Sequence, residues 1–252
     1  MYPVAFHIGP RVVYWYGVMI VLACVMGELL LLWFARRERI AWDAALLWIL
    51  FLLVGGGAGA QLGGLIRDSL VSPLMVSPLA HGGQVSYGAF VGIVVAGSVS
   101  LRVTRSSLWQ LLDLVAPSVA LGFAITRIGC FLSGCCYGRP TSLPWGVTFP
   151  PLSPAGMAFG QSPLHPVQLY SSLGNLALFA ALLALRRRPR FKGFLFLSWA
   201  ALYAVLRFVL ECFRADPRVA LGLTAAQLAN LVIGPLALGL LWVKGRGKRA
   251  GQ

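Results

Sequence analysis

Long apolar segments occupy most of this chain and limit the folds that are open to it. Seven stretches are long and apolar enough to cross a hydrocarbon layer, which takes roughly 20 helical residues. They cover residues 12–35, 44–66, 85–101, 108–125, 166–185, 193–212 and 223–243. A backbone inside lipid must satisfy its own hydrogen bonds, and a helix does so within one segment. We therefore predict an all-α polytopic membrane protein with seven transmembrane helices, forming a single domain over residues 1–252.

The charged residues are few, and their positions indicate how the chain is oriented. Only 11% of the residues are charged, yet the net charge is +14. Fourteen of the 21 lysines and arginines fall on one side of a seven-span chain, at residues 36–39, 102–105, 186–192 and 244–249. Cytoplasmic loops carry such an excess, so we predict an outside N-terminus and a cytoplasmic C-terminus. Basic residues placed this way contact anionic lipid head groups, which argues against a nucleic-acid partner.

One arginine, Arg207, lies inside an apolar span. A charge deep in a bilayer costs about 3 kcal/mol on insertion scales, so such a side chain usually faces the protein interior and has a partner. Tyr203, Arg207 and Glu211 are spaced four residues apart, which places them on one face of a helix. Two interpretations follow: an ion pair that ties helices together, or a cation that Glu211 orients toward an anionic substrate.

The segment TRIGCFLSGCCYGRP, which follows the fourth span, combines turn residues with two arginines. We expect an irregular Gly/Cys-rich loop on the outer side, because three glycines make a continuous helix unlikely: Gly129, Gly134 and Gly138. Arg127 and Arg139 flank this loop, and the fork of a guanidinium suits a phosphate group. The anion present at that depth is a lipid head group. The alternative is an interfacial loop whose arginines extend to the membrane surface.

Three of the five cysteines lie in this segment: Cys130, Cys135 and Cys136. We predict no metal site, since neither a second pair of cysteines nor a nearby histidine completes one. A disulfide between Cys130 and either Cys135 or Cys136 is an alternative, because the outer face of the membrane can be oxidising. The interpretation that we favour is that of small, partly buried side chains packing a tight loop.

Several motifs, in order along the chain, resemble those of one family. YWYGVMI, which includes Tyr16, lies in the first span and VGGGAGAQLGG in the second. TRIGCFLSGCCYGRP follows the fourth span, HPVQLY begins at His165, and YAVLRFVLECFR lies in the sixth span. LTAAQLANL, at the start of the last span, is a weaker match. Together they resemble the phosphatidylglycerol–prolipoprotein diacylglyceryl transferases, which are seven-span enzymes.

The resemblance implies a reaction and a set of site residues. These enzymes lie in the bacterial plasma (inner) membrane and move a diacylglyceryl group from phosphatidylglycerol to the thiol of a lipobox cysteine, releasing glycerol phosphate. On this resemblance Arg127 and Arg207 stabilise charge on the donor phosphate as the carbon–oxygen bond breaks. No cofactor is expected. The residues expected to contact the substrates are Tyr16, Gly138, Arg139, His165, Gln168, Tyr203, Glu211 and Arg214.

Three positions depart from the pattern of the family. Tyr87 stands where a histidine is usual, Cys130 where an asparagine is usual, and Ser171 where a glutamate often follows. These departures leave open two alternatives: a non-catalytic relative that binds or moves lipid, and a transferase with a different acceptor.

The acceptor thiol must lose a proton, because a thiol with a pKa near 8.5 is mostly protonated at neutral pH. We place His81 and Tyr87 in the catalytic set. An unperturbed tyrosine is a poor base at pH 7, so we expect Tyr87 to shape the pocket. The arginines would then stabilise the thiolate, with His81 as the optional base. We expect His165 to hydrogen-bond backbone around Pro166, and it is the next candidate for proton transfer.

Overall fold

The computed structural model describes residues 4–70, 81–187 and 191–250. The side chains of residues 67–70 and 81–87 are not described, so the expected roles of His81 and Tyr87 lie outside the described residues. The elements are β1 (Val4–Ile8), β2 (Arg11–Tyr14), α1 (Trp15–Arg37), α2 (Trp42–Leu70), α3 (His81–Thr104), α4 (Leu108–Ser133), α5 (Pro154–Phe159), α6 (Val167–Arg186), α7 (Phe194–Glu211) and α8 (Ala225–Ala250).

Six helices of the described chain are long and apolar enough to cross a membrane: α1, residues Trp42–Ile66 of α2, α4, α6, α7, and Ala225–Gly247 of α8. A shorter apolar segment, Gly88–Thr104, lies in α3. The expectation of a mostly helical, multi-pass membrane protein is therefore confirmed. Each helix satisfies the hydrogen bonds of its own backbone, as a lipid environment requires.

Two sequence expectations about the helices are wrong. The stretch 12–35 does not begin as a helix, because β2 pairs with β1 in an antiparallel hairpin and α1 starts only at Trp15. A short hairpin therefore precedes the helices, and the fold is otherwise helical. The fourth helix does not end at residue 125 but continues through Gly129 to Ser133, so the irregular loop begins at Gly134. Gly129 is not a helix breaker here, since a glycine costs only about 1 kcal/mol inside a helix that gains close packing.

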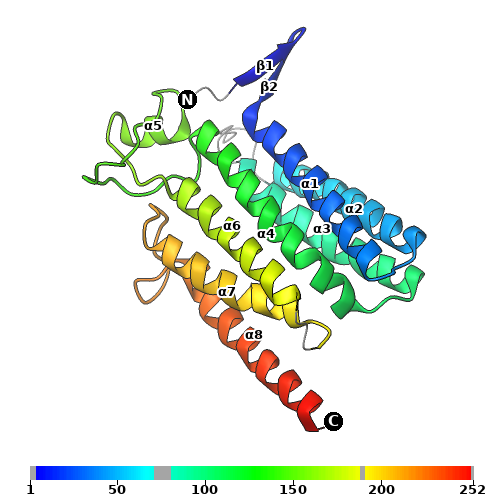
Figure 1. Ribbon diagram of the computed structural model, residues 1–252. Coiled ribbons are helices and arrows are strands. Elements are labelled where there is room, and N and C mark those ends of the chain that lie inside the picture. Colours follow the sequence, from blue (N-terminus) through cyan, green and yellow to red (C-terminus); the bar gives the residue numbers. More distant parts are fainter. Residues whose placement is uncertain (1–3, 71–80, 188–190, 251–252) are drawn as a thin grey trace. The chain divides into compact units, whose positions relative to one another are not determined.

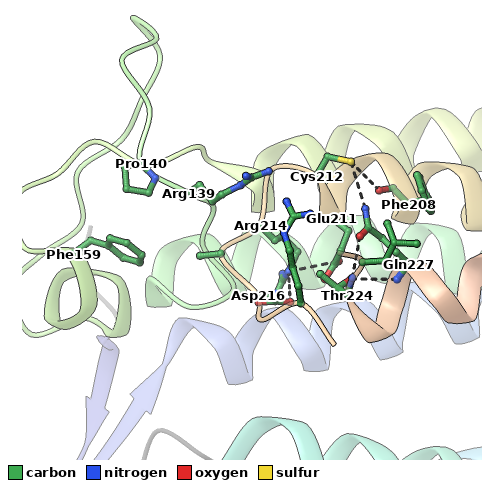
Figure 2. Close-up of a pocket in the computed structure, with 13 residues that line it drawn as sticks. Arg139, Pro140, Phe159, Phe208, Glu211, Cys212, Arg214, Asp216, Thr224 and Gln227 are labelled. Atoms are coloured by element: carbon green, nitrogen blue, oxygen red, sulfur yellow. Dashed lines mark hydrogen bonds and ion pairs between the residues drawn. The ribbon is translucent and has the colours of Figure 1, made fainter. Parts of the chain in front are cut away.

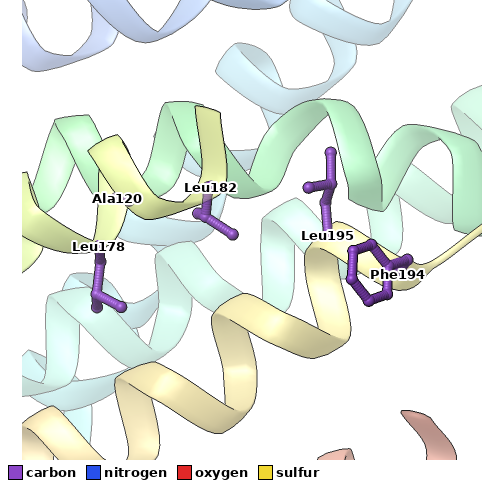
Figure 3. Close-up of a cluster of buried hydrophobic side chains, with 5 residues drawn as sticks. All are labelled: Ala120, Leu178, Leu182, Phe194 and Leu195. Carbon is purple, nitrogen blue, oxygen red and sulfur yellow. The ribbon is translucent and has the colours of Figure 1, made fainter. Parts of the chain in front are cut away.

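The chain divides into two compact units, of which the first comprises Met1–Leu30 and Leu112–Gln252. Helices α4, α6, α7 and α8 of this unit lie side by side (Figure 1). A buried apolar cluster packs α4 and α6 against the start of α7; its members are Ala120, Leu178, Leu182, Phe194 and Leu195 (Figure 3). The cluster holds the helices that carry the polar residues described below.

A half-buried carboxylate fixes where α7 begins. Asp113 of α4 accepts hydrogen bonds from the amides of Gly193 and Phe196, at 2.6 and 2.9 Å. The first amides of a helix have no partner within the helix, and a carboxylate there also meets the positive end of the helix dipole. Asp113 thus acts as a cap supplied by another helix and sets the position of α7 along α4.

The second unit, Leu31–Leu111, contains a glycine-lined contact between α2 and α3. A Cβ on Gly55 would come within 2.6 Å of the carbonyl oxygen of Gly92, and a Cβ on Gly59 would overlap the carbonyl oxygen of Gly88. Small residues four positions apart let two helix backbones approach closely inside a membrane, where apolar burial gives little drive for association. The glycine-rich sequence of the second span is therefore explained by packing.

We expect Gly59→Ala to destabilise the fold by about 1–3 kcal/mol, because the added methyl group overpacks a backbone contact. Gly57→Ala is the matched control on the same helix, since a Cβ there meets nothing within 4 Å. Thermal unfolding of the two variants in detergent measures the difference. Equal melting temperatures for both would contradict the proposed closeness of α2 and α3.

Candidate functional site

Helix α4 ends in a turn that requires a glycine at position 134. The amide of Gly134 donates to the carbonyl of Phe131 at 3.2 Å, and the amide of Cys135 donates to the carbonyl of Cys130 at 3.1 Å. This pair of bonds is a Schellman motif, in which the residue after the helix is left-handed, and Gly134 has φ +66°. A Cβ there would also lie 2.7 Å from the Cβ of Ser153. The turn reverses the chain immediately after the helix.

The reversed chain brings three thiols together. The Sγ atoms of Cys130, Cys135 and Cys136 lie within 4.8 Å of one another. All five cysteines of the chain are described and are free, so the disulfide that the sequence left open is not formed. Cys136 has φ +57°, a strained conformation for a residue with a side chain. The buried Gln168 holds this turn, since its Nε2 donates to the carbonyl of Cys135 at 2.8 Å.

Tyr16 lies in the same region because α1 packs closely on α4. A Cβ on Gly129 would come within 2.9 Å of the Cβ of Met19 and 3.3 Å of the Cα of Tyr16. Tyr16 borders a cavity of about 640 Å³ whose wall also includes Cys135. Its hydroxyl interacts electrostatically with Arg127 and with the three clustered thiols. A residue of the first span therefore joins the residues at the end of α4.

Two arginines pair with one buried carboxylate at the end of α7, and a third arginine lies near them. The Glu211 side chain is 1% exposed, and its Oε2 lies 3.0 Å from Nη2 of Arg207 and 3.7 Å from Nε of Arg214. Arg127 of α4 interacts electrostatically with Arg214 and with Tyr203. The expected pairing of Arg207 with Glu211 on one helical face is confirmed. Glu211 and Asp216 together balance Arg207 and Arg214, so Arg127 gives the site its surplus positive charge.

Arg214 connects this charge cluster to the cysteine turn. Its Nε and Nη2 donate to the two carboxylate oxygens of Asp216 at 2.8 and 3.1 Å, and its Nη1 donates to the carbonyl of Cys136 at 3.5 Å. Burial raises the pKa of the Asp216 carboxyl, but hydrogen bonds and attraction from Arg214 outweigh this and hold the pKa below its usual value. Burial lowers the pKa of Arg214, and the Asp216 carboxylate more than reverses this and raises it. The pair is therefore ionised throughout the neutral range.

A second cavity, of about 470 Å³, opens beside this pair (Figure 2). Arg139, Arg214 and Arg218 contribute guanidinium groups to its wall, and Thr224 and Gln227 contribute polar groups from the start of α8. Arg139 is exposed. Such a set of donors, with more positive than negative charge, suits an anionic group with several oxygens.

Backbone pairing holds the loop that carries Arg139. Gly138 forms an antiparallel bridge with Arg214, and its amide donates to the carbonyl of His165 at 3.1 Å. A Cβ on Gly138 would lie 2.6 Å from that carbonyl oxygen and 2.6 Å from Cγ2 of Val167. Only glycine fits between these groups, so the late glycine of the motif allows a close backbone approach.

The carbonyl of His165 accepts a hydrogen bond from the amide of Val167 at 2.8 Å, next to Pro166, while the ring of His165 makes other contacts. Its Nδ1 lies 3.4 Å from the hydroxyl of Tyr170, and its ring packs edge-on against Phe213. The hydroxyl of Tyr170 also accepts a hydrogen bond from Nε1 of Trp145 at 2.7 Å. The ring of His165 therefore belongs to an aromatic group at the edge of the loop.

The structure brings together most of the residues that the sequence singled out. Arg127, Tyr203, Arg207, Glu211 and Arg214 form one cluster, with Tyr16 and the cysteines next to it. Gly138, Arg139 and His165 belong to the adjoining loop, and Gln168 lies beneath it. Sequence reasoning missed Asp216 and Gln227. An arginine two residues before an aspartate in a polar connection is the signal that could have identified Asp216.

We expect Asp216→Asn to lower the melting temperature at pH 7 by removing a contribution of up to about 1 kcal/mol, since the Asp216 side chain is 38% exposed. The folded pKa of Asp216 is lowered, so this contribution is present above the unfolded pKa of about 3.9 and is lost as the pH falls through the folded pKa. The difference in melting temperature between wild type and Asp216→Asn should therefore disappear in acid. Melting curves between pH 3 and 7 measure it, and a gap independent of pH would contradict the assignment.

Comparison with known proteins assigns the chain to a family. Residues 3–243 match the family described as prolipoprotein diacylglyceryl transferase. A relative from Cupriavidus metallidurans, named phosphatidylglycerol–prolipoprotein diacylglyceryl transferase, is 34% identical, over 98% of this chain and 95% of its own. Proteins of the same name from Pseudomonas fluorescens and Acaryochloris marina are 33% and 36% identical, over 95% and 96% of this chain and 92% and 90% of theirs. The resemblance found in the sequence is confirmed, and the chain belongs to the prolipoprotein diacylglyceryl transferase family.

Proposed function

We propose that this protein transfers a diacylglyceryl group from phosphatidylglycerol to the thiol of a lipobox cysteine in a prolipoprotein and releases glycerol phosphate. The observation that carries the proposal is the arginine cluster, defined as Arg127, Arg207 and Arg214, of which Arg207 and Arg214 pair with the buried Glu211. Family membership supports the transferase class, and the six apolar helices support work within a bilayer.

The arginine cluster suits the donor half of this reaction. Attack at the glycerol carbon breaks its bond to the phosphate oxygen, and negative charge grows on the phosphate that leaves. Groups fixed in place beforehand stabilise such charge without reorganising during the step. Glu211 fixes Arg207 at 3.0 Å, and Asp216 fixes Arg214 through two hydrogen bonds. Arg139 lines the cavity beside them and adds a further cation for the glycerol phosphate that departs.

The acceptor half of the reaction needs a thiolate and a place for a peptide cysteine. The cavity beside Tyr16 is our candidate for that place, since Tyr16 in its wall interacts electrostatically with Arg127. We keep Tyr87 as a residue that shapes the pocket and His81 as the optional base. The loop after α4 is held by contacts with Gln168, Gly138 and His165. Tyr203 stacks on Trp199 and interacts electrostatically with Arg127.

We also propose the arrangement of the chain in the membrane. The segment Gly88–Thr104 of α3 would be the shortest of seven spans, in a single domain over residues 1–252. The positive charges at residues 36–39, 102–105, 186–192 and 244–249 support a cytoplasmic C-terminus and an outside N-terminus. The loop after α4 would then lie at the outer face of the bacterial inner membrane, where prolipoproteins would reach it.

We expect Arg127→Ala and Arg207→Ala to lower transfer from phosphatidylglycerol by about 100-fold or more, since each removes a charge-assisted contact to the phosphate. Arg127→Lys should restore little, because a point charge does not replace a planar fork. Arg246→Ala, in the basic C-terminal end of α8, is the matched control and should retain transfer.

The measurement is transfer to a lipobox peptide by the purified full chain. A second readout is the maturation of lipoproteins in cells depleted of their own transferase. Wild-type turnover in either alanine variant would contradict the donor assignment, and lipid binding without any transfer by the wild type would indicate the non-catalytic alternative.

The orientation predicts a labelling pattern in intact cells. A cysteine at Leu152, which is 92% exposed in the loop after α4, should react with an impermeant thiol reagent, while a cysteine at Gln252 should react only after permeabilisation. The chain without an added cysteine gives the background. The opposite pattern would reverse the proposed orientation.

A further inference from the structure

The cysteine cluster, defined as Cys130, Cys135 and Cys136, has the geometry of a metal site with three thiolate ligands. The three Sγ atoms lie within 4.8 Å of one another. With a zinc–sulfur bond of about 2.3 Å, sulfur atoms on one zinc ion lie roughly 3.8–4.0 Å apart in tetrahedral or trigonal geometry. Each sulfur would have to move by roughly half an ångström to bind a shared ion, which a small rotation about the Cα–Cβ bond allows.

The backbone around the cysteine cluster is held as the ligands of a metal usually are. The carbonyl of Cys130 accepts a hydrogen bond from the amide of Cys135, and Gln168 and Arg214 donate to the carbonyls of Cys135 and Cys136. Cys136 keeps a left-handed φ of +57° although it is not a glycine. Outer contacts of this kind orient metal ligands and are part of the site.

The charges around the cysteine cluster match a bound divalent cation. Three thiolates and one Zn²⁺ carry a net charge of −1. Arg127 and Arg214 both interact electrostatically with Cys136, and Arg127 also with Cys130. Soft thiolate ligands select zinc over magnesium or calcium, which prefer oxygen. The two guanidinium groups offset the remaining negative charge.

An ion held by the three thiolates alone would keep one coordination position open. Three protein ligands and one open position are the arrangement of catalytic zinc sites, whereas structural sites use four protein ligands. Within the described residues, no further cysteine, histidine, aspartate or glutamate completes the group. Cys135 lines the cavity beside Tyr16, so one of the three ligands stands at the wall of that cavity.

We propose that the cysteine cluster binds zinc and that the acceptor thiol of the prolipoprotein becomes the fourth ligand. The inference rests on the proposed transferase function and extends it to the acceptor. A thiol that coordinates a metal is deprotonated outright, so its proton passes to solvent. The zinc-bound sulfur then attacks the glycerol carbon of phosphatidylglycerol. A carbon–sulfur bond forms, the carbon–oxygen bond breaks, and glycerol phosphate leaves with the electron pair of that bond.

This role accounts for two departures of the sequence from its family at once. Cys130 stands where an asparagine is usual, and Tyr87 stands where a histidine is usual. Neutral pH leaves only about 3% of a free thiol ionised when its pKa is near 8.5. A bound metal replaces the base that Tyr87 cannot provide. The thiol is then activated from the same helix that carries Arg127.

The first test is the metal content of the purified full chain. We expect about one zinc per chain by elemental mass spectrometry, and loss of it in Cys130→Ser, Cys135→Ser and Cys136→Ser. Cys24→Ser is the matched control, because Cys24 is exposed on α1 outside the cluster, and it should keep the metal. A melting curve of each variant shows whether it is folded. Absence of zinc from folded wild type, or a disulfide between Cys130 and either neighbour in active protein, would overturn the proposal.

The second test asks whether the acceptor binds the metal. In cobalt-substituted full chain, a lipobox peptide should shift the thiolate-to-cobalt charge-transfer band, and the same peptide with serine for cysteine should not. Removing the metal with a chelator should lower transfer at pH 7 by about 30-fold or more, the factor expected from the ionised fraction of a free thiol, and zinc should restore it. Transfer unaffected by metal removal would overturn the inference and leave the transferase function intact. A peptide-dependent band shift without any transfer would support the site and contradict the proposed function.

Discussion

The site depends on one buried carboxylate, that of Glu211. A carboxylate that is 1% exposed is stable only with partners, and Arg207 and Arg214 supply them from the same end of α7. The dependence is mutual, since removing one member of a buried pair costs about 3–5 kcal/mol by leaving a charge without compensation. The carboxylate therefore fixes two guanidinium groups near each other that would otherwise repel. Asp216 neutralises Arg214 in turn, so Arg127 supplies the surplus of positive charge that an anionic lipid head group requires.

Two glycines give the chain the path that this arrangement needs. Gly134 ends α4 with a left-handed turn, and Gly138 lets the returning strand lie against the carbonyl of His165. The segment between them carries two of the three clustered cysteines. Arg214 then joins the two halves, because it binds Asp216 on one side and the carbonyl of Cys136 on the other. The arginine cluster and the cysteine cluster are thus parts of one hydrogen-bonded structure.

The sequence predicted the features that depend on residues close together in the chain. Arg207 and Glu211 lie one helical turn apart, so their pairing follows from spacing alone, and the apolar spans follow from their length. Other features depend on partners far along the chain. Whether Gly129 breaks α4 is decided by its contact with Met19 and Tyr16 of α1, and no local pattern contains that contact. The meeting of the cysteines likewise follows from a turn whose register is set by Gly134, which the sequence marked only as irregular.

The positions of the two clusters suit a displacement at carbon. In such a reaction the nucleophile and the leaving oxygen lie on opposite sides of the carbon, so the group that holds the phosphate and the group that holds the sulfur must be neighbours and yet distinct. Near-attack geometry further requires the sulfur to be about 3–3.5 Å from the carbon before the step. Arg127 and Cys130 are three residues apart on α4, which puts them on the same side of one rigid helix. A helix fixes their separation more firmly than two loops would, so the donor charge and the acceptor sulfur keep their spacing while the loop after α4 admits a peptide.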